Sequence, residues 1–377
     1  MLEFISYFSF SLFTILILSV NKFLIHKHIY VIKKKVKWGA SMLKQLLEKE
    51  YGVQVQEYVK IDAYDALRGN GWLYLIAKPG GREEEEVAEL QRIAEHLHQY
   101  GDRHVPYFLT TKDGKILTKW EENNYCVFAR RQEEVPPPKQ KLGRKLAKFH
   151  ERGGMVPFYV ERSSRIGKWK ELWEKRLEQM EKVWNGLLFQ SPEDEFERLF
   201  IETFPYYMGL TENAIQYLVD TEIDVEPGNT DNGTVCHERF LSSSWGKDYL
   251  IKNPFDWVFD HRSRDLAEWT RERYFYNIQT YQREITQFYE DYQSISSLSP
   301  FSWRLLYSRI LFPLHYFECI ENYYITRSEQ DKKILEERLQ KILNQSREYE
   351  AFLRTFYNLA GAPVRKMKLP MPDWLMN

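Results

Sequence analysis

The sequence predicts a two-lobed α+β protein, with a small β-rich N-terminal lobe and a helical C-terminal lobe. Strand-forming residues and tight-turn signals are concentrated before residue 136. Helical patterns fill most of the chain after that point. Between the two regions stand three consecutive prolines, Pro136 to Pro138, which mark a linker or lobe boundary.

The N-terminal lobe is expected over residues 42–135. The predicted elements are a helix over 42–51, strands over 53–59 and 72–78, a helix over 82–100, and strands over 107–111, 116–120 and 125–129. The first helix ends at Gly52. Gly69-Asn70-Gly71 predicts a hairpin between the first two strands, and Lys112-Asp-Gly-Lys115 predicts a second hairpin between 107–111 and 116–120.

The C-terminal lobe is expected over residues 136–365, followed by an irregular tail over 366–377. Helices are predicted over 141–150, 169–184, 194–204 and 213–220, and again from about 265 to 360. Residues 225–253 form a loop-rich interlude with two short strand-like pieces, 234–237 and 248–251.

Composition excludes several classes of protein. The 377 residues are 43% hydrophobic, which argues against extensive disorder. Because 53 basic and 54 acidic residues nearly cancel, a dedicated nucleic-acid binder is not expected. The three cysteines form no zinc-binding set and indicate a reducing compartment. Aromatic residues make up 16% of the chain, which indicates either helices packed through aromatic faces or a tyrosine-rich surface suited to an assembly.

Residues 1–41 form a separate extension. An apolar run from Phe4 to Val20 is followed by six lysines, with Glu3 as the sole acid, for a net charge of +5. Charges placed after the apolar run argue against a signal peptide. A membrane anchor holding the rest of the chain in the cytoplasm is one interpretation. The other is that the native chain begins at Met42, so a membrane is an expected partner only if residues 1–41 are native.

Four segments resemble, in order, the conserved segments of aminoglycoside phosphotransferases. They are the strand 72–78, Gly143-Arg-Lys-Leu-Ala-Lys-Phe-His150, Val235-Cys-His-Glu-Arg239, and Tyr249-Leu-Ile251 followed by Asp265-Leu-Ala267. In that family the corresponding pieces are the strand with the nucleotide-binding lysine, a G-x-x-L-A-x-x-H helix, the strand leading into H-G-D, and I-D-[FW]…D-L-A. The resemblance covers about residues 42 to 360 and implies a two-lobed, protein-kinase-like fold of the aminoglycoside phosphotransferase type.

Within this superfamily, the C-terminal helices narrow the resemblance. The segments Arg304–Glu318 and Glu321–Tyr324 read like a C-lobe helix of the spore coat kinase-like proteins of the CotS/YutH group. The resemblance implies a protein made in the mother-cell cytoplasm and placed in the spore coat, with other coat proteins as its partners.

Phosphoryl transfer needs a lysine on the phosphates, an Asp at the acceptor hydroxyl, and an Asn and a second Asp on Mg²⁺. The resemblance places Lys78 at the lysine position, with Glu89 or a neighbour among Glu83–Glu86 as its acidic partner. The alternative is that Lys78 is a solvated residue at the end of a strand. Gly69-Asn70-Gly71 is either a shortened nucleotide loop or, more simply, a hairpin.

The expected catalytic loop lacks its acid. The position two residues after His237 is Arg239, and the position of the metal-binding Asn is Ser244. An arginine cannot accept a proton at neutral pH. A shift of one residue would offer Glu238 as the base. His237 itself is expected to be a buried histidine that packs the loop.

The carboxylate expected on the metal is also missing, because the family spacing places Asn253 there. Asp256 would restore a metal site if the turn at Pro254 shifts the register. Otherwise Asp256 and Asp260 are surface acids on a loop. Asp265 is expected to begin a helix and to cap its free N–H groups.

These substitutions favour a degenerate kinase-like protein, a pseudokinase that serves as a structural or interaction component of the coat and needs no cofactor. The alternative is an active small-molecule kinase that uses ATP and Mg²⁺, with Glu238 as base, Asp256 on the metal and Lys78 on the phosphates. An intermediate case is nucleotide binding without transfer.

Overall fold

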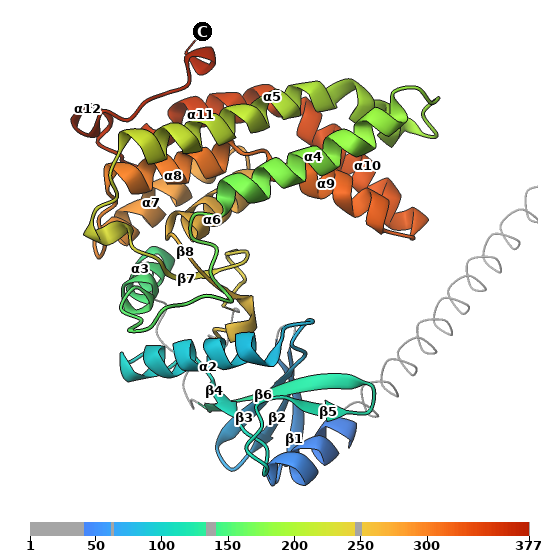
Figure 1. The fold of residues 1–377 in the computed structure, drawn as a ribbon, viewed down its shortest axis with the longest axis vertical. Helices are drawn as coiled ribbons and strands as arrows, with labels where there is room; N and C mark the ends of the chain where they lie inside the picture. Colours follow the sequence, from blue (N-terminus) through green and yellow to red (C-terminus); the bar gives the residue numbers. More distant parts are fainter. Residues whose placement is uncertain (1–40, 62–63, 133–140, 246–250, 377) are drawn as a thin grey trace, which may run out of the picture. The chain divides into compact units, whose positions relative to one another are not determined.

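The computed structural model describes residues 41–61, 64–132, 141–245 and 251–376 (Figure 1). The chain divides into two compact units, one built from residues up to 84 with 107–134 and the other from 85–106 with 135 onward. Residues 85–106, which the sequence places in the first lobe, therefore group with the second. The extension before Ser41 and the linker Pro136–Pro138 lie outside the described residues. In the described part of the chain, none of the helices combines the length and apolar character that a bilayer span requires.

The first unit is an antiparallel sheet with a short helix beside it. Its strands are β1 (Glu57–Ile61), β2 (Tyr64–Gly69), β3 (Trp72–Ala77), β4 (Tyr107–Leu109), β5 (Thr118–Trp120) and β6 (Asn123–Arg131). Their order is β1-β2-β3-β6-β4, and β5 also pairs with β6. The helix covers 41–51, its last turn being the π-helical η1 (Leu47–Tyr51), and it ends at Gly52 as predicted. Leu43, Leu46 and Leu47 of this helix pack against alternate residues of the sheet, which buries the core of the unit.

The turn predicted at Gly69-Asn70-Gly71 is confirmed, but it joins β3 to β2, a strand that the sequence analysis did not predict, instead of to the strand expected over 53–59. Gly69 pairs with Trp72, which leaves Asn70 and Gly71 as a two-residue turn. Both turn residues have positive φ, 52° and 76°, as a type I′ turn requires.

The second predicted hairpin is wrong. The chain does turn at the expected place, where the Thr111 amide donates to the Lys115 carbonyl at 2.9 Å. The flanking strands β4 and β5, however, each pair with β6 rather than with one another. The reason is that β6 is nine residues long and accommodates β5 along its first half and β4 along its second.

The second unit is largely helical. Its helices are α2 (Glu84–Gln99), α3 (Leu142–Gly153), α4 (Trp169–Leu187), α5 (Glu195–Asp224), α6 (Ser263–Tyr276), α7 (Tyr281–Gln293), α8 (Pro300–Leu311), α9 (Leu314–Ile325), α10 (Glu329–Asn344), α11 (Ser346–Leu359) and α12 (Val364–Met367). Short 3-10 turns occur at η2 (Asn229–Asp231), η3 (Pro254–Asp256) and η4 (Asp373–Leu375). The long helices α4 and α5 pack together, and α8 packs against both α5 and α6.

Two helices predicted over 194–204 and 213–220 are one continuous helix, α5, so that prediction is wrong. The prediction stops before Pro205, which has no N–H to donate to the Ile201 carbonyl one turn earlier. In the structure, the indole N–H of Trp184 on α4 donates to that carbonyl at 3.0 Å. A tertiary contact therefore supplies the donor that the local sequence lacks, and the helix continues to Asp224.

A two-stranded sheet leads into the loop that the sequence analysis identifies as the expected catalytic loop. The predicted strand 234–237 is confirmed as β7 (Thr234–His237). The strand expected at 248–251 falls mostly on residues outside the described part, and Ile251 is not in a strand. The partner of β7 is instead β8 (Trp257–Asp260), and His237 pairs with Trp257.

Aromatic side chains fill the interior of the second unit. The largest fully buried ones include Trp257, Trp303 and Tyr289. Buried hydroxyls are hydrogen-bonded, as in the 2.8 Å contact between Tyr217 and Tyr357. Much of the aromatic content is therefore packing material, as the first of the two compositional interpretations expects.

Candidate functional site

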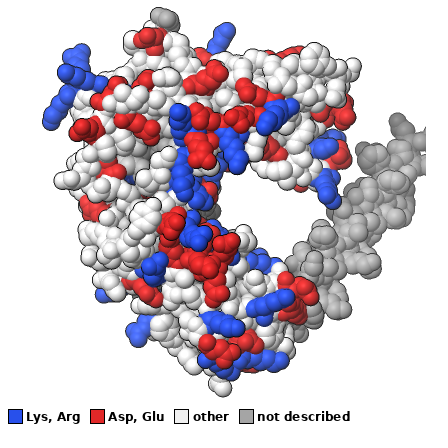
Figure 2. Space-filling model, viewed as in Figure 1, with Lys and Arg blue, Asp and Glu red and all other residues white. Residues whose placement is uncertain are grey.

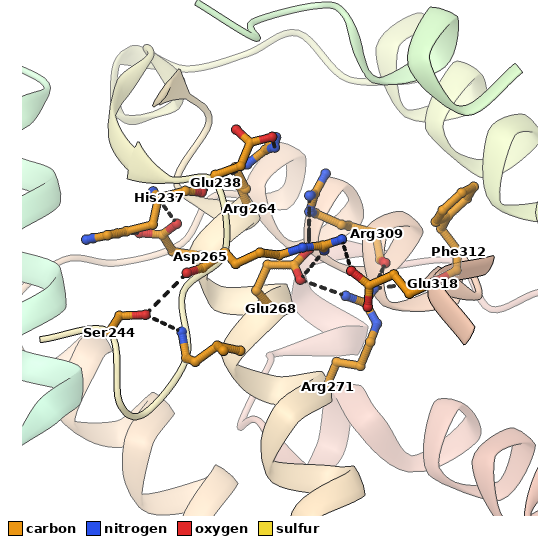
Figure 3. Close-up of polar contacts among 12 residues, drawn as sticks. His237, Glu238, Ser244, Arg264, Asp265, Glu268, Arg271, Arg309, Phe312 and Glu318 are labelled. Atoms are coloured by element: carbon orange, nitrogen blue, oxygen red, sulfur yellow. Dashed lines mark hydrogen bonds and ion pairs between the residues drawn. The ribbon is translucent and has the colours of Figure 1, made fainter. Parts of the chain in front are cut away.

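The loop after β7 is held by a buried carboxylate on α6. Asp265 accepts a hydrogen bond from the His237 backbone N–H at 2.8 Å and another from the His237 ring Nδ1 at 2.7 Å (Figure 3). The oxygen that accepts from the His237 ring, Oδ2, also accepts from Nε2 of His150 on α3, at 3.1 Å. Asp265 thus joins β7, α3 and α6, and the structure confirms that His237 is buried.

The hydrogen bonds around Asp265 define the tautomers of both histidines. Trp245 donates its indole N–H to His237 Nε2 at 2.9 Å, so the proton of His237 is on Nδ1 and is donated to Asp265. Nε2 of His150 donates to the Asp265 carboxylate, and Nδ1 of the same ring lies 2.8 Å from the Tyr292 hydroxyl.

The charge states of Asp265 and His150 follow from burial and from the groups beside them. Burial lowers the pKa of His150 to about 4, against the opposing pull of Asp265. Burial alone would raise the pKa of Asp265, but His237 and His150 hold it at about 2. Asp265 is therefore a buried anion at neutral pH, and its partners are neutral hydrogen-bond donors.

The helix-capping role expected for Asp265 is wrong. The residue lies in the first turn of α6, whose N-cap is Arg262 without a side-chain cap. Its carboxylate receives hydrogen bonds from β7 and from two histidine rings instead of from the amides of its own helix. The spacing of a helix start does not reveal this, because the donors come from distant segments.

Arg239, at the expected position of the catalytic acid, belongs to a partly buried ionic cluster. Its guanidinium contacts Glu268 on α6 at 2.7 Å and Glu318 on α9. Glu268 also pairs with Arg271 at 3.2 Å and with Arg309 of α8 at 2.9 Å. The ionic cluster consists of Arg239, Glu268, Arg271, Arg309 and Glu318.

Electrostatics in the ionic cluster favour the charged state of its central acid. Burial would raise the pKa of Glu268, but Arg271, Arg309 and Arg239 hold it far below its usual range. Burial lowers the pKa of Arg309 to about 10, which leaves it protonated at neutral pH. Ion pairs with Glu268 and Glu318 hold the Arg239 side chain in position.

The residue before Arg239 faces outward. Glu238 is exposed, and its carboxylate lies 3.6 Å from a guanidinium nitrogen of Arg264. Its backbone N–H donates to the Asp256 carbonyl at 2.7 Å. Glu238 is therefore a solvated acid paired with a buried arginine.

Ser244 and Asn253, the residues expected at the metal positions, hydrogen-bond within their own loops. The Ser244 hydroxyl accepts the Leu241 N–H at 2.8 Å and donates to the Arg239 carbonyl at 3.2 Å, which closes the turn after β7. The Asn253 side chain caps η3 by accepting the Phe255 N–H at 3.1 Å, and it donates to Asp256 at 3.2 Å. Two neutral side chains with oxygens already engaged do not fit Mg²⁺, which prefers carboxylates.

Asp260 is not the surface acid that the sequence suggests. Its side chain is buried and accepts hydrogen bonds from the Trp169 indole and from Arg264, both at 2.8 Å. Its place at the end of β8, between α4 and α6, explains the burial. Asp256 is partly exposed and contacts Asn253.

Lys78 lies in the first unit and Glu89 lies in the second. The hydrogen bonds described for each residue are to residues of the same unit. Lys78 Nζ donates to the Asn123 side chain at 2.9 Å. Glu89 accepts the backbone N–H groups of 161–163 and the Ser163 hydroxyl, at 2.6 to 3.2 Å. Burial would raise the pKa of Glu89, but these bonds lower it. Glu89 therefore anchors the segment that leads into α4.

One further group has ligand geometry for a metal. In the described part of the chain, ligand atoms of His150, Cys236 and Asp265 lie within 4.8 Å of one another. Each is already hydrogen-bonded, and Cys236 Sγ donates to the His261 carbonyl at 3.4 Å. Burial raises the pKa of the Cys236 thiol well above its usual value, which disfavours the thiolate that a metal needs.

Sequence reasoning missed Glu268, Glu318, Arg271 and Arg309. A signal for them is present in the sequence, because Arg309 lies in a largely apolar helix and Glu268 and Arg271 are three residues apart on α6. On the surface of the second unit, too, acidic and basic side chains lie next to one another, as Figure 2 shows.

Comparisons with known proteins agree with this architecture. The family described as "Spore coat putative kinase YutH" matches residues 44–356. The endospore coat-associated protein YutH of Bacillus subtilis (strain 168) is 39% identical over 338 residues, which cover 89% of this chain and 98% of that protein.

Solved structures with a similar fold are small-molecule kinases. An aminoglycoside phosphotransferase from Alicyclobacillus acidocaldarius has a TM-score of 0.60 at 14% identity, covering 83% of this chain and 94% of its own. The AMP-bound spectinomycin phosphotransferase APH(9)-Ia has a TM-score of 0.55 at 17% identity, with coverage of 86% and 98%. These likenesses confirm the predicted two-lobed, kinase-like α+β fold.

Proposed function

Because this chain belongs to the YutH family of spore coat kinase-like proteins, we propose that it is a non-catalytic component of the endospore coat. In this proposal it is made in the mother-cell cytoplasm and assembles with other coat proteins through its surface. It performs no phosphoryl transfer and requires no cofactor.

Arg239 carries the proposal. A transferase of this fold needs a carboxylate near the acceptor hydroxyl, and a guanidinium can neither accept that proton nor attract Mg²⁺. Arg239 is also held by Glu268 and Glu318, so turning aside would break its ion pairs with both acids. The side chain at this position thus has a structural use.

The metal positions support the same conclusion. The side chains of Ser244 and Asn253 form hydrogen bonds within their own turns and add no negative charge. Without a carboxylate, Mg²⁺ bound to a nucleotide would lose most of its protein ligation. The residues present therefore do not fit the metal that the fold otherwise uses.

Phosphoryl transfer is tested with the purified full chain and radiolabelled ATP. We expect no Mg²⁺-dependent ATP turnover and no thermal shift with ATP and Mg²⁺. A nucleotide at 100 times its Kd would stabilise the protein by about 2.7 kcal/mol, which is readily measured. The Alicyclobacillus phosphotransferase serves as the positive control.

Turnover that disappears in Glu238→Gln or Asp256→Asn would overturn the proposal in favour of an active kinase of altered geometry. Both residues reach the surface, so these variants are expected to fold. A thermal shift without turnover would instead indicate nucleotide binding as a conformational prop.

Coat assembly is tested separately with a fluorescent fusion in sporulating Bacillus subtilis. The expected result is a ring of fluorescence around the forespore. Uniform fluorescence in the mother cell throughout sporulation would contradict a coat location.

A further inference from the structure

The second unit contains a cavity of about 460 Å³ next to Arg239. Its walls come from α6, α9 and α10 and from the loop after β7. This volume lies in the range of sites that bind small molecules. The ionic cluster forms one wall, through Arg239, Glu268, Arg271 and Glu318.

Three side chains that line the cavity carry buried polar atoms with no hydrogen-bond partner among the described residues. The atoms are Nδ1 of His315, Oε1 of Gln345 and Nε of Arg271. His315 is only 6% exposed, and the rings of Phe275 and Tyr349 pack on it at 4.5 and 4.9 Å. Buried polar atoms are normally paired, so the lining of this cavity lacks hydrogen-bond partners that a protein interior usually supplies.

His315 is uncharged in this setting. Burial, together with the nearby charges of Arg271 and Arg338, lowers its pKa well below the usual value. A neutral imidazole offers one donor and one acceptor. The net charge of the cavity therefore depends on its arginines, lysine and glutamates.

The acids that line the cavity already have partners. Glu268 and Glu318 are engaged by arginines of the ionic cluster, and Glu272 accepts hydrogen bonds from Ser242. Lys341 and Arg338, three residues apart on α10, also line it, and no ion pair is described for either in the residues that the structure covers. The unbalanced charge at the cavity is therefore positive.

The remaining wall is apolar. Phe275 and Tyr276 of α6, Leu314 of α9 and Ile342 of α10 also line the cavity. We propose that this cavity binds a small organic anion, namely a carboxylate attached to an aromatic ring. The carboxylate is held by Arg338 and Lys341, and the ring packs on the apolar wall. This inference goes beyond the proposed function and does not depend on whether phosphoryl transfer occurs.

A charge series of three probes tests the proposal on the full chain. Benzoate, benzamide and benzylammonium have similar size and differ in charge, and their binding is measured by saturation-transfer NMR and titration at millimolar concentrations. Benzoate is expected to bind roughly tenfold more tightly than benzamide, because charge-assisted hydrogen bonds exceed neutral ones. Benzylammonium is expected to bind least.

Variants on α10 locate the anion. Arg338→Gln and Lys341→Gln should each weaken benzoate by about three- to tenfold and leave benzamide nearly unchanged. Lys333→Gln, an exposed cation on the same helix outside the cavity, is the matched control and should have no effect. Leu241→Trp, at an exposed position that lines the cavity, should weaken benzoate and benzamide together.

Equal binding of benzoate and benzamide would overturn the proposal, as would a Lys333→Gln effect equal to that of Lys341→Gln. Absence of benzoate binding at millimolar concentration would overturn it too. Because Arg338 and Lys341 are exposed, loss of folding does not obscure these outcomes.

Discussion

Trp184 donates its indole N–H to the Ile201 carbonyl at 3.0 Å, and that carbonyl is the one that Pro205 leaves without its helical donor. The contact joins α4 to α5 at the one position where the backbone bonding of α5 is interrupted by proline. The two helices that the sequence predicts over 194–204 and 213–220 are therefore one continuous helix, α5.

Trp184→Phe is expected to lower the free energy of unfolding by about 1 kcal/mol, because it removes this hydrogen bond and keeps an aromatic ring beside Phe204. Urea denaturation measures the loss. In a Pro205→Ala background the backbone supplies its own donor, so the loss should be smaller. Equal losses in both backgrounds would contradict the role assigned to Trp184.

Glu268→Gln is expected to destabilise the protein by about 3–5 kcal/mol. The change removes the central negative charge from three arginines, two of them fully buried in the second unit. Glu337→Gln on the exposed face of α10 is the control and should stay within about 0.5 kcal/mol. Similar denaturation midpoints for the two variants would show that the ionic cluster adds little stability.

Stability should fall as the pH drops from about 6.5 to 4, in part because of His150. Its pKa is about 4 in the folded chain and 6.5 as the ordinary value, so folding favours the neutral ring. The stabilisation is complete above the unfolded pKa and is lost as protons bind the unfolded chain first, with a magnitude of about 3 kcal/mol. Urea denaturation at several pH values measures the slope.

His150→Gln keeps a donor toward Asp265 but does not titrate, so its stability should vary less with pH over this range. An unchanged slope would assign the pH dependence elsewhere. Below about pH 4 both proteins should lose further stability, because the pKa of Asp265 is lowered to about 2 and its stabilising charge is lost as it protonates.

Glu89→Gln is expected to loosen the segment 161–163, because an amide nitrogen cannot accept the backbone N–H groups that a carboxylate oxygen accepts. Hydrogen exchange at these amides should accelerate roughly tenfold or more. Glu95→Gln, an exposed change on the same helix, should leave exchange there unaltered. Unchanged protection in Glu89→Gln would contradict the anchoring role.

Local chemistry made much of the architecture predictable. Asn70-Gly71 requires a tight turn, and the apolar spacing over α2 and α3 requires helices, because these preferences depend on neighbouring residues alone. The same holds for the missing acid after His237, since arginine cannot accept a proton in any surroundings at neutral pH. The order of the four motifs along the chain was sufficient to predict the kinase-like fold.

Long-range partners were decided by the tertiary structure. β4 and β5 both pair with β6, α5 continues past Pro205, and the side chains of Asp260 and Asp265 are buried. Each outcome depends on a donor or strand edge supplied from elsewhere in the chain, which no local pattern encodes. The sequence by itself thus determined that position 239 is an arginine, while only the folded chain decided that Glu268 and Glu318 hold it in place, because they come together with it only through the packing of α6 and α9.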